Sequence, residues 1–160
     1  MGGDYLTKRE IHVVYTREDD NITFTSQVKD LKRRIKVAER ADADYFISIH
    51  MNSSKYNDGA SGFEIYTDNR NKDIAALVKK IESSLTSLNY TKNRGIKNTR
   101  ESGQLYVIDN NPVPSMFIDA GFISDPNDFT YLNSRKGQKE VSEAIGFGLL
   151  QHLEDKNNKS

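Results

Sequence analysis

Short apolar runs alternate with long amphipathic segments along this chain, and that alternation constrains its fold more than any other feature. Runs rich in β-branched and aromatic residues, which are typical of strands, occur at 11–15, 45–49, 62–66 and 115–119. Apolar residues spaced by three and four predict helices at 27–40, 71–88 and about 136–153, and a short helix follows Asp125 through Leu132. We therefore expect a single α/β domain in which helices flank the sheet on both faces.

Residues 89–114 are predicted to form a long loop, interrupted by the apolar run at 105–108. This region contains Gly95 and Gly103, with Arg94, Lys97 and Arg100 between and around them. It is either an ordinary solvated loop or the wall of a groove that meets an anionic or peptide ligand. The polar residues 154–160 are expected to form a solvated tail.

Two side chains with chemical potential follow apolar strands, and ligands of α/β sheets gather beyond the carboxyl ends of strands. His50 follows FISI and is either a metal ligand or a hydrogen-bonded residue that caps the end of its strand. Asp119 follows MFI and is either a carboxylate of a metal-hydrolase site or a capping residue that accepts the N–H of Gly121 or Phe122. The local sequence leaves both alternatives open for each residue.

The other two histidines are better explained without a site. His12 lies between Ile11 and Val13, so alternation places it on a solvated or half-buried side. His152 is expected in the last turn of the final helix, where a cation complements the helix dipole.

Composition excludes several classes of function. The 160 residues include 23 basic and 23 acidic residues, so the formal net charge is zero and nothing suggests a nucleic acid or an anionic membrane as the partner. The absence of cysteine excludes disulfides, thiolate metal sites and a cysteine nucleophile. The sequence as given has no apolar N-terminal region of a signal peptide and no apolar run long enough for a membrane segment.

Six motifs, in this order and spacing, give the chain a family resemblance. They are YTREDD at 15–20, Leu31-x-x-Arg34-x-x-x-Ala38, ADYFISIHMN at 43–52, SGFEIY at 61–66, NRGIK at 93–97 and PSMFIDAGFIS at 114–124. Together they resemble the zinc-dependent N-acetylmuramoyl-L-alanine amidases of the type-3 family, which act in bacterial cell-wall turnover. The resemblance extends from about residue 5 to 153.

The resemblance implies a mixed, mostly parallel sheet and a cell-wall hydrolase. Its reaction is hydrolysis of the amide between N-acetylmuramic acid and the L-alanine of the stem peptide, so the partner is peptidoglycan or a muropeptide and the location is extracellular or the cell wall. In the family, zinc is held by a His, a Glu and a second His, which corresponds to His50, and the base is a Glu at the position of Asp119. Asn52, Arg94, Gly121 and Phe122 match the motifs and are expected to contact substrate.

The chain also departs from the family pattern. The family begins with a strand that supplies the first His and a helix that supplies the Glu ligand. We expect this chain to lack that strand and most of that helix, giving an N-terminally truncated amidase-like domain over 1–153. Asp119 is one methylene shorter than Glu, and a base displaced by about 1 Å loses roughly a hundredfold in rate. Asp125 stands where the family usually has Asn.

Two functions therefore remain open. In the first, the domain is an amidase whose other zinc ligands come from a missing N-terminal segment or a protein partner. In the second, it is a non-catalytic amidase-like module that binds a muropeptide or another cell-wall protein. A weaker third alternative is a related zinc hydrolase that acts on a different amide.

Overall fold

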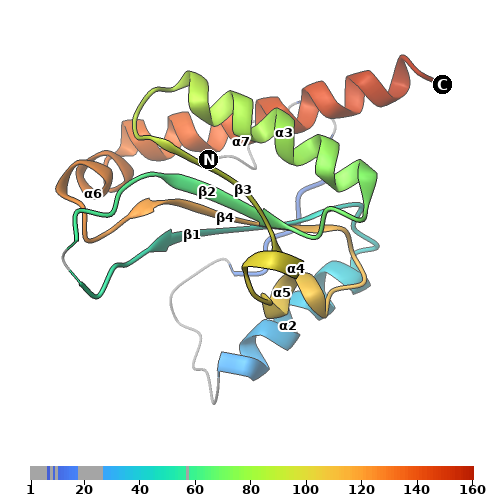
Figure 1. The fold of residues 1–160 in the computed structure, drawn as a ribbon. Coiled ribbons are helices and arrows are strands. Elements are labelled where there is room, and N and C mark those ends of the chain that lie inside the picture. Colours follow the sequence, from blue (N-terminus) through green and yellow to red (C-terminus); the bar gives the residue numbers. More distant parts are fainter. Residues whose placement is uncertain (1–6, 8, 10, 18–26, 57) are drawn as a thin grey trace.

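A four-stranded mixed sheet forms the centre of the molecule (Figure 1). The computed structural model describes residues 7, 9, 11–17, 27–56 and 58–160. The strands are β1 (Phe46–Asn52), β2 (Phe63–Thr67), β3 (Asn93–Asn98) and β4 (Ser115–Phe122), in the order β1-β4-β2-β3. Neighbours β1 and β4 are parallel, as are β2 and β3, whereas β2 and β4 are antiparallel. The predicted mixed, mostly parallel sheet is confirmed.

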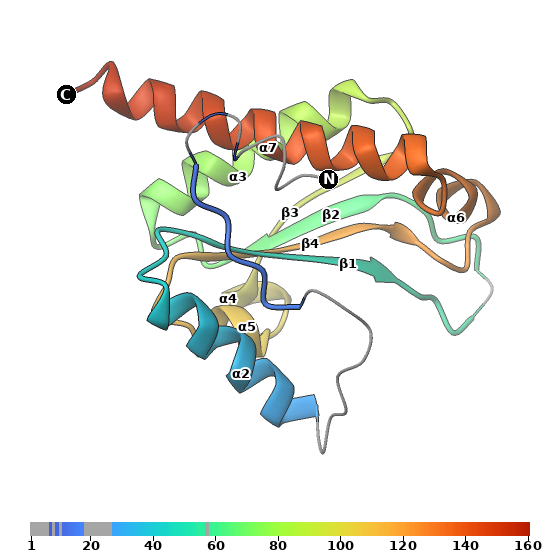
Figure 2. The ribbon, with the colours of Figure 1, turned by 180° about the vertical axis from the view of Figure 1, so that it is seen from behind.

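Helices cover both faces of this sheet (Figures 1 and 2). On one face lie the long helices α3 (Lys72–Ser87) and α7 (Arg135–Asn157). On the other lie α2 (Gln27–Arg40) and the short helices α4 (Thr99–Ser102) and α5 (Tyr106–Asp109). Helix α6 (Pro126–Leu132) follows β4 and leads into α7. The two-sided α/β arrangement expected from the alternating pattern is therefore present. None of the helices in the described residues is long and apolar enough to cross a bilayer.

The main core lies between the sheet and the α3–α7 pair. It contains fully buried Phe63 and Ile65 of β2, Met116 and Ile118 of β4, and the apolar face of α3. The two helices approach so closely that a Cβ at Gly148 would lie 2.9 Å from the Ile81 backbone. A smaller cluster on the opposite face joins α2 and α5 to the sheet.

The expected long loop at 89–114 is wrong. It contains β3 at the sheet edge and the helical turns α4 and α5, the latter formed by the apolar run at 105–108. The sequence did not predict β3 because this strand lacks alternating apolar residues. Its polar composition suits a short strand at the edge of a sheet, since such strands resist pairing with other chains. Gly95 within it has a φ of 93°, which a residue with a Cβ rarely adopts.

Other boundaries also differ from the expectations. The described residues 11–17 contain no strand, because the segment passes across β1 instead of pairing with it, with Ile11 packed on the main core (Figure 2). The resemblance places the last turns of the family's first helix at residues 5–9, which fall largely outside the described residues. Strands β1 and β4 continue past His50 and Asp119, so neither residue ends its strand. Helix α7 continues through Asn157, four residues into the expected tail.

Candidate functional site

Three ionisable side chains form a row across three neighbouring strands. His50 of β1 is the register partner of Asp119 of β4, and Asp119 is in turn the partner of Glu64 of β2. Residues directly opposite one another in a sheet project to the same face. The row therefore lies on the face that α2 and α5 cover. The sequence predicts two members of this row, His50 and Asp119, at the same edge of the sheet, and the structure adds Glu64.

His50 is half-buried and held in place on two sides. Its ring stacks on Phe117 with centroids 4.4 Å apart, and its Nε2 lies 2.8 Å from the Ser48 Oγ. Burial lowers the pKa of His50, and the nearby Arg34 guanidinium lowers it further. The imidazole is therefore held in its neutral form, which is the form that binds metals. The alternative of a residue capping a strand end does not hold, since β1 continues to Asn52.

Asp119 is a buried carboxylate without a partner among the described residues. It is 8% exposed and makes no hydrogen bond or ion pair with any described side chain. Burial, and secondly the charge of Glu64, raise the pKa of Asp119 to about 6. A carboxylate with a pKa close to the working pH is suited to act as a general base.

Glu64, in contrast, is fully engaged. Its Oε1 accepts a hydrogen bond of 2.8 Å from the Tyr66 hydroxyl, and its Oε2 lies 3.3 Å from the Arg94 Nε. The guanidinium of Arg94 also sits 5.2 Å over the Phe122 ring. Arg94 therefore balances one of two adjacent buried carboxylates and leaves the charge of Asp119 uncompensated.

The capping role considered for Asp119 belongs to Asp128 instead. The Oδ2 of Asp128 accepts the N–H groups of Phe122 at 2.9 Å and Gly62 at 3.0 Å, and this side chain is 1% exposed. It ties the start of β2 to the end of β4 through α6. No local pattern identified Asp128, because its partner Gly62 is 66 residues away.

The four residues expected to contact substrate lie near this end of the sheet, with different accessibility. Asn52 is half-buried, and its Oδ1 accepts the N–H of Ser53. Arg94 lies in β3 and is partly exposed. Phe122 is buried, and so is Gly121, where a Cβ would lie 2.8 Å from the Leu132 side chain. The contacts of the last two indicate packing, and substrate contact by any of the four stays a prediction.

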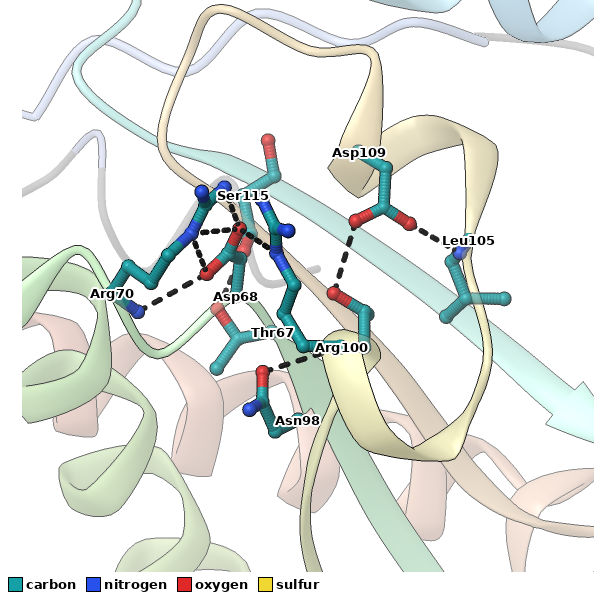
Figure 3. Close-up of polar contacts among 9 residues, drawn as sticks. Thr67, Asp68, Arg70, Asn98, Arg100, Leu105, Asp109 and Ser115 are labelled. Atoms are coloured by element: carbon teal, nitrogen blue, oxygen red, sulfur yellow. Dashed lines mark hydrogen bonds and ion pairs between the residues drawn. The ribbon is translucent and has the colours of Figure 1, made fainter.

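Arg100, another cation of the predicted groove wall, lies away from this site. Arg100 lies at the opposite end of β2, where its Nε is 3.5 Å from Asp68, which also binds Arg70 (Figure 3). Asp109 closes the same region by accepting from Thr99 and from the Leu105 N–H. These contacts fasten α4 and α5 to the sheet, and they explain Arg100 structurally.

The remaining histidines lie away from the row. His12 is exposed and Ile11 and Val13 are half-buried, as alternation predicted. His152 is 4% exposed, and its Nε2 lies 2.9 Å from the Asp73 Oδ1. The expected helix-dipole role was wrong, since α7 continues five residues further and His152 joins it to α3.

The row does not by itself form a zinc site. Catalytic zinc normally takes three protein ligands. In the described part of the chain, no three His, Asp or Glu side chains lie close enough together to hold a metal ion. His50 offers one nitrogen donor to a metal, whereas both carboxylate oxygens of Glu64 already contact Tyr66 and Arg94.

Comparison with known proteins identifies the family to which this fold belongs. The family model described as N-acetylmuramoyl-L-alanine amidase matches residues 3–151. The chain belongs to this amidase family. The match spans nearly the whole chain, including His50, Glu64 and Asp119, and it confirms the resemblance found in the sequence.

Relatives within the amidase family agree. The chain is 29% identical to a germination-specific N-acetylmuramoyl-L-alanine amidase of Bacillus subtilis over 97% of this chain and 67% of the relative. It is 30% identical to the amidase LytC of the same organism over 87% of this chain but 26% of LytC. The chain therefore spans about two thirds of one relative and about a quarter of the other.

A solved amidase domain has the same architecture. The catalytic domain of CwlV, an N-acetylmuramoyl-L-alanine amidase from Bacillus (Paenibacillus) polymyxa var. colistinus, superposes with a TM-score of 0.80 at 28% identity. The similarity covers 96% of this chain and 79% of the CwlV domain. The α/β fold described above is thus that of an amidase catalytic domain.

Proposed function

We propose that this chain forms the catalytic core of a peptidoglycan amidase that cleaves the bond between N-acetylmuramic acid and the L-alanine of the stem peptide. Membership of the amidase family supports the reaction class. The observation that carries the proposal for this chain is the row of His50, Asp119 and Glu64 on adjacent strands. Several relatives bear cell-wall names, so the proposed place of work is the cell wall, outside the cytoplasm.

In this proposal Asp119 accepts a proton from the attacking water. Its uncompensated, buried carboxylate has the raised pKa that such a base needs. Arg94 and Tyr66 hold Glu64 beside it, and the Glu64 charge keeps the pKa of Asp119 high. The roles of these residues do not depend on how a metal is held.

His50 is proposed as one ligand of the zinc ion on which the amidase family depends. Because the described residues do not complete a zinc site, the other donors come from residues outside the described part of the chain or from a partner polypeptide. Asn52 and Arg94 are the proposed substrate contacts with exposed surface. Phe122 is buried, is the register partner of Asn52 and has the Arg94 guanidinium over its ring, and Gly121 precedes it in β4.

Zinc binding and hydrolysis measured on the same protein test this proposal. We would determine zinc stoichiometry by calorimetry and follow release of the stem peptide from a muramoyl peptide, for wild type, His50→Ala and Asp119→Asn. His12→Ala is the matched control, since this histidine is exposed. We expect His50→Ala to lose zinc and turnover, Asp119→Asn to lose turnover but keep zinc, and the control to resemble wild type.

Two results would refute parts of the proposal. Equal zinc affinity in His50→Ala and wild type would exclude His50 as a ligand. Absence of turnover in zinc-loaded wild type, with muropeptide binding retained, would instead favour the non-catalytic amidase-like module. Asp119→Glu adds a direct test of the short base: a properly placed carboxylate is expected to raise kcat, by up to about a hundredfold if the displacement is near 1 Å.

A further inference from the structure

Helix α2 carries a continuous line of positive charge on its outer side. The spacing of three and four residues places these side chains on one helical face over about 16 Å. We call this set the basic stripe; it consists of Lys29, Lys32, Arg33, Lys36 and Arg40. Together with Val37 these residues line a surface groove of about 400 Å³, and no acidic side chain takes part in that lining.

The stripe concentrates charge that the rest of the chain does not share. Residues 27–40 include six basic and two acidic residues, a net charge of +4, although the whole chain is neutral. One of the two acids, Asp30, is buried and pairs with Arg33 and Arg34. Within the described structure, Lys32, Lys36 and Arg40 have no ion pair or hydrogen bond through their side chains.

The like charges on the outer side of α2 differ from the paired charges of an ordinary solvated helix such as α7. On α7, Lys136 lies near Glu140 and Lys139 near Glu143, each at the i,i+4 spacing that stabilises a helix. On α2 the i,i+4 neighbours along the stripe are like charges, which destabilise a helix by similar amounts. A stripe that weakens its own helix suggests a function outside the fold.

The position of α2 makes the stripe accessible. Its inner side, with Leu31, Ile35 and Ala38, packs toward α5 and the sheet. Figures 1 and 2 show α2 at the border of the molecule, with no other described element on its outer side. Arg34 lies on the inner side and pairs with the buried Asp30, so it is not part of the stripe.

We propose that the basic stripe binds a linear polymer of phosphodiester-linked repeats, which lies along α2. Lysine presents a compact charge that suits single phosphate groups, and a row of such charges gains affinity by releasing the counterions of a polyanion. The choice of a wall polymer as the source of the phosphates rests on the proposed function. The stripe would hold the domain on the wall while the site works on adjacent peptidoglycan.

An anionic membrane fits the stripe less well. Helices that bind membrane interfaces place Trp, Phe or Leu in the lipid beside their basic residues. On α2 the large apolar side chains turn toward the protein, and Val28 is its exposed large apolar residue. A flat lipid surface would therefore meet charge alone.

Binding to poly(glycerol phosphate) tests the proposal without any need for turnover. We would measure affinity by calorimetry with metal-free protein at several salt concentrations, for wild type and for Lys32→Gln/Lys36→Gln/Arg40→Gln. The matched control is Lys79→Gln/Lys139→Gln/Lys159→Gln, which removes three exposed charges elsewhere. Circular dichroism would verify that both variants are folded. Phosphatidylglycerol vesicles and a single-stranded oligonucleotide of equal phosphate content are the competing ligands.

We expect the stripe variant to bind the polymer about tenfold or more weakly, with a shallower salt dependence, while the control matches wild type. Hydrolysis of a small soluble muramoyl peptide should be unchanged in the stripe variant, so loss of polymer binding and loss of catalysis can be told apart. Equal losses in both variants, or no loss in either, would overturn the proposal. Tighter binding to vesicles or to the oligonucleotide would overturn the assignment to a wall polymer.

Discussion

Replacing Asp119 with Asn is expected to stabilise the metal-free protein at neutral pH. The carboxylate of Asp119 is 8% exposed, adjoins the charge of Glu64 and has no hydrogen bond or ion pair with a described side chain. Its ionisation is therefore unfavourable in the folded state, and Asn removes the charge with little change of shape. The residue proposed as the base would thus lower the stability of the fold that carries it.

The sign and size of this effect follow from the pKa of Asp119. Its folded value of about 6 lies above the ordinary value of 3.8, so the folded state holds the proton more tightly. The contribution of this group to stability is complete below about pH 4 and is lost as pH rises through 6. The difference between the two values corresponds to at most about 3 kcal/mol. The free energy of unfolding of Asp119→Asn should therefore exceed that of wild type by up to this amount at pH 8, and the two should be equal near pH 4.

Urea unfolding of chelator-treated protein at pH 4, 6 and 8 would measure this difference. Asp155→Asn is an informative control, because the hydrogen bond and charge of Lys80 lower the pKa of this exposed carboxyl. That variant should lose stability at pH 8, the opposite sign. A lower stability of Asp119→Asn than of wild type at pH 8, or a difference between them that does not change with pH, would contradict this prediction.

Three further predictions concern polar contacts near the site and between α3 and α7. Asp128→Ala removes a buried acceptor of two backbone N–H groups. We expect the free energy of unfolding to fall by about 3 kcal/mol and calorimetry to show a Tm lower by roughly 6–12 °C. A decrease below about 1 kcal/mol would contradict this expectation. Arg94→Met leaves the buried Glu64 without its cation and should lower the free energy of unfolding by about 2 kcal/mol at pH 8. In a double-mutant cycle, adding Glu64→Gln should restore most of this loss. Strictly additive effects of the two substitutions would disprove the coupling between Arg94 and Glu64. Burial raises the pKa of Asp73, but hydrogen bonds from Tyr45, Lys156 and His152 outweigh it and lower the pKa overall. The stabilisation by this carboxylate is therefore present above about pH 4 and is lost as the pH falls through the lowered pKa. Asp73→Asn should be less stable than wild type at pH 7, and urea titrations should show this difference shrinking as the pH falls below 4.

The sequence predicted the parts of this structure that depend on local pattern. Three long helices, the short helix capped by Asp125 and three of the four strands follow from apolar periodicity. The shared location of His50 and Asp119 also followed, since both come late in parallel strands. Neither required knowledge of contacts between distant segments.

What the sequence did not predict depends on such contacts. Strand β3 has polar residues at the sheet border and pairs through its backbone, which leaves no apolar signature. Glu64 joined the row because β2 runs against β4, so a residue near the start of β2 meets one late in β4. The position of Glu64 as a polar residue inside the apolar run FEIY was a signal that it has a special role. Interpreting that signal required the direction of β2 relative to β4.

The cap formed by Asp128 has a consequence for the order of folding. Its two bonds join the start of β2, the end of β4 and α6, and the one to Gly62 closes a loop of 66 residues. Closing so long a loop early is entropically unfavourable, so these bonds should form after β2 and β4 have paired. Loss of the cap would then speed unfolding and leave the folding rate nearly unchanged, a φ-value near zero. The end of the sheet that carries the candidate site would be the last part to become native and the first to open.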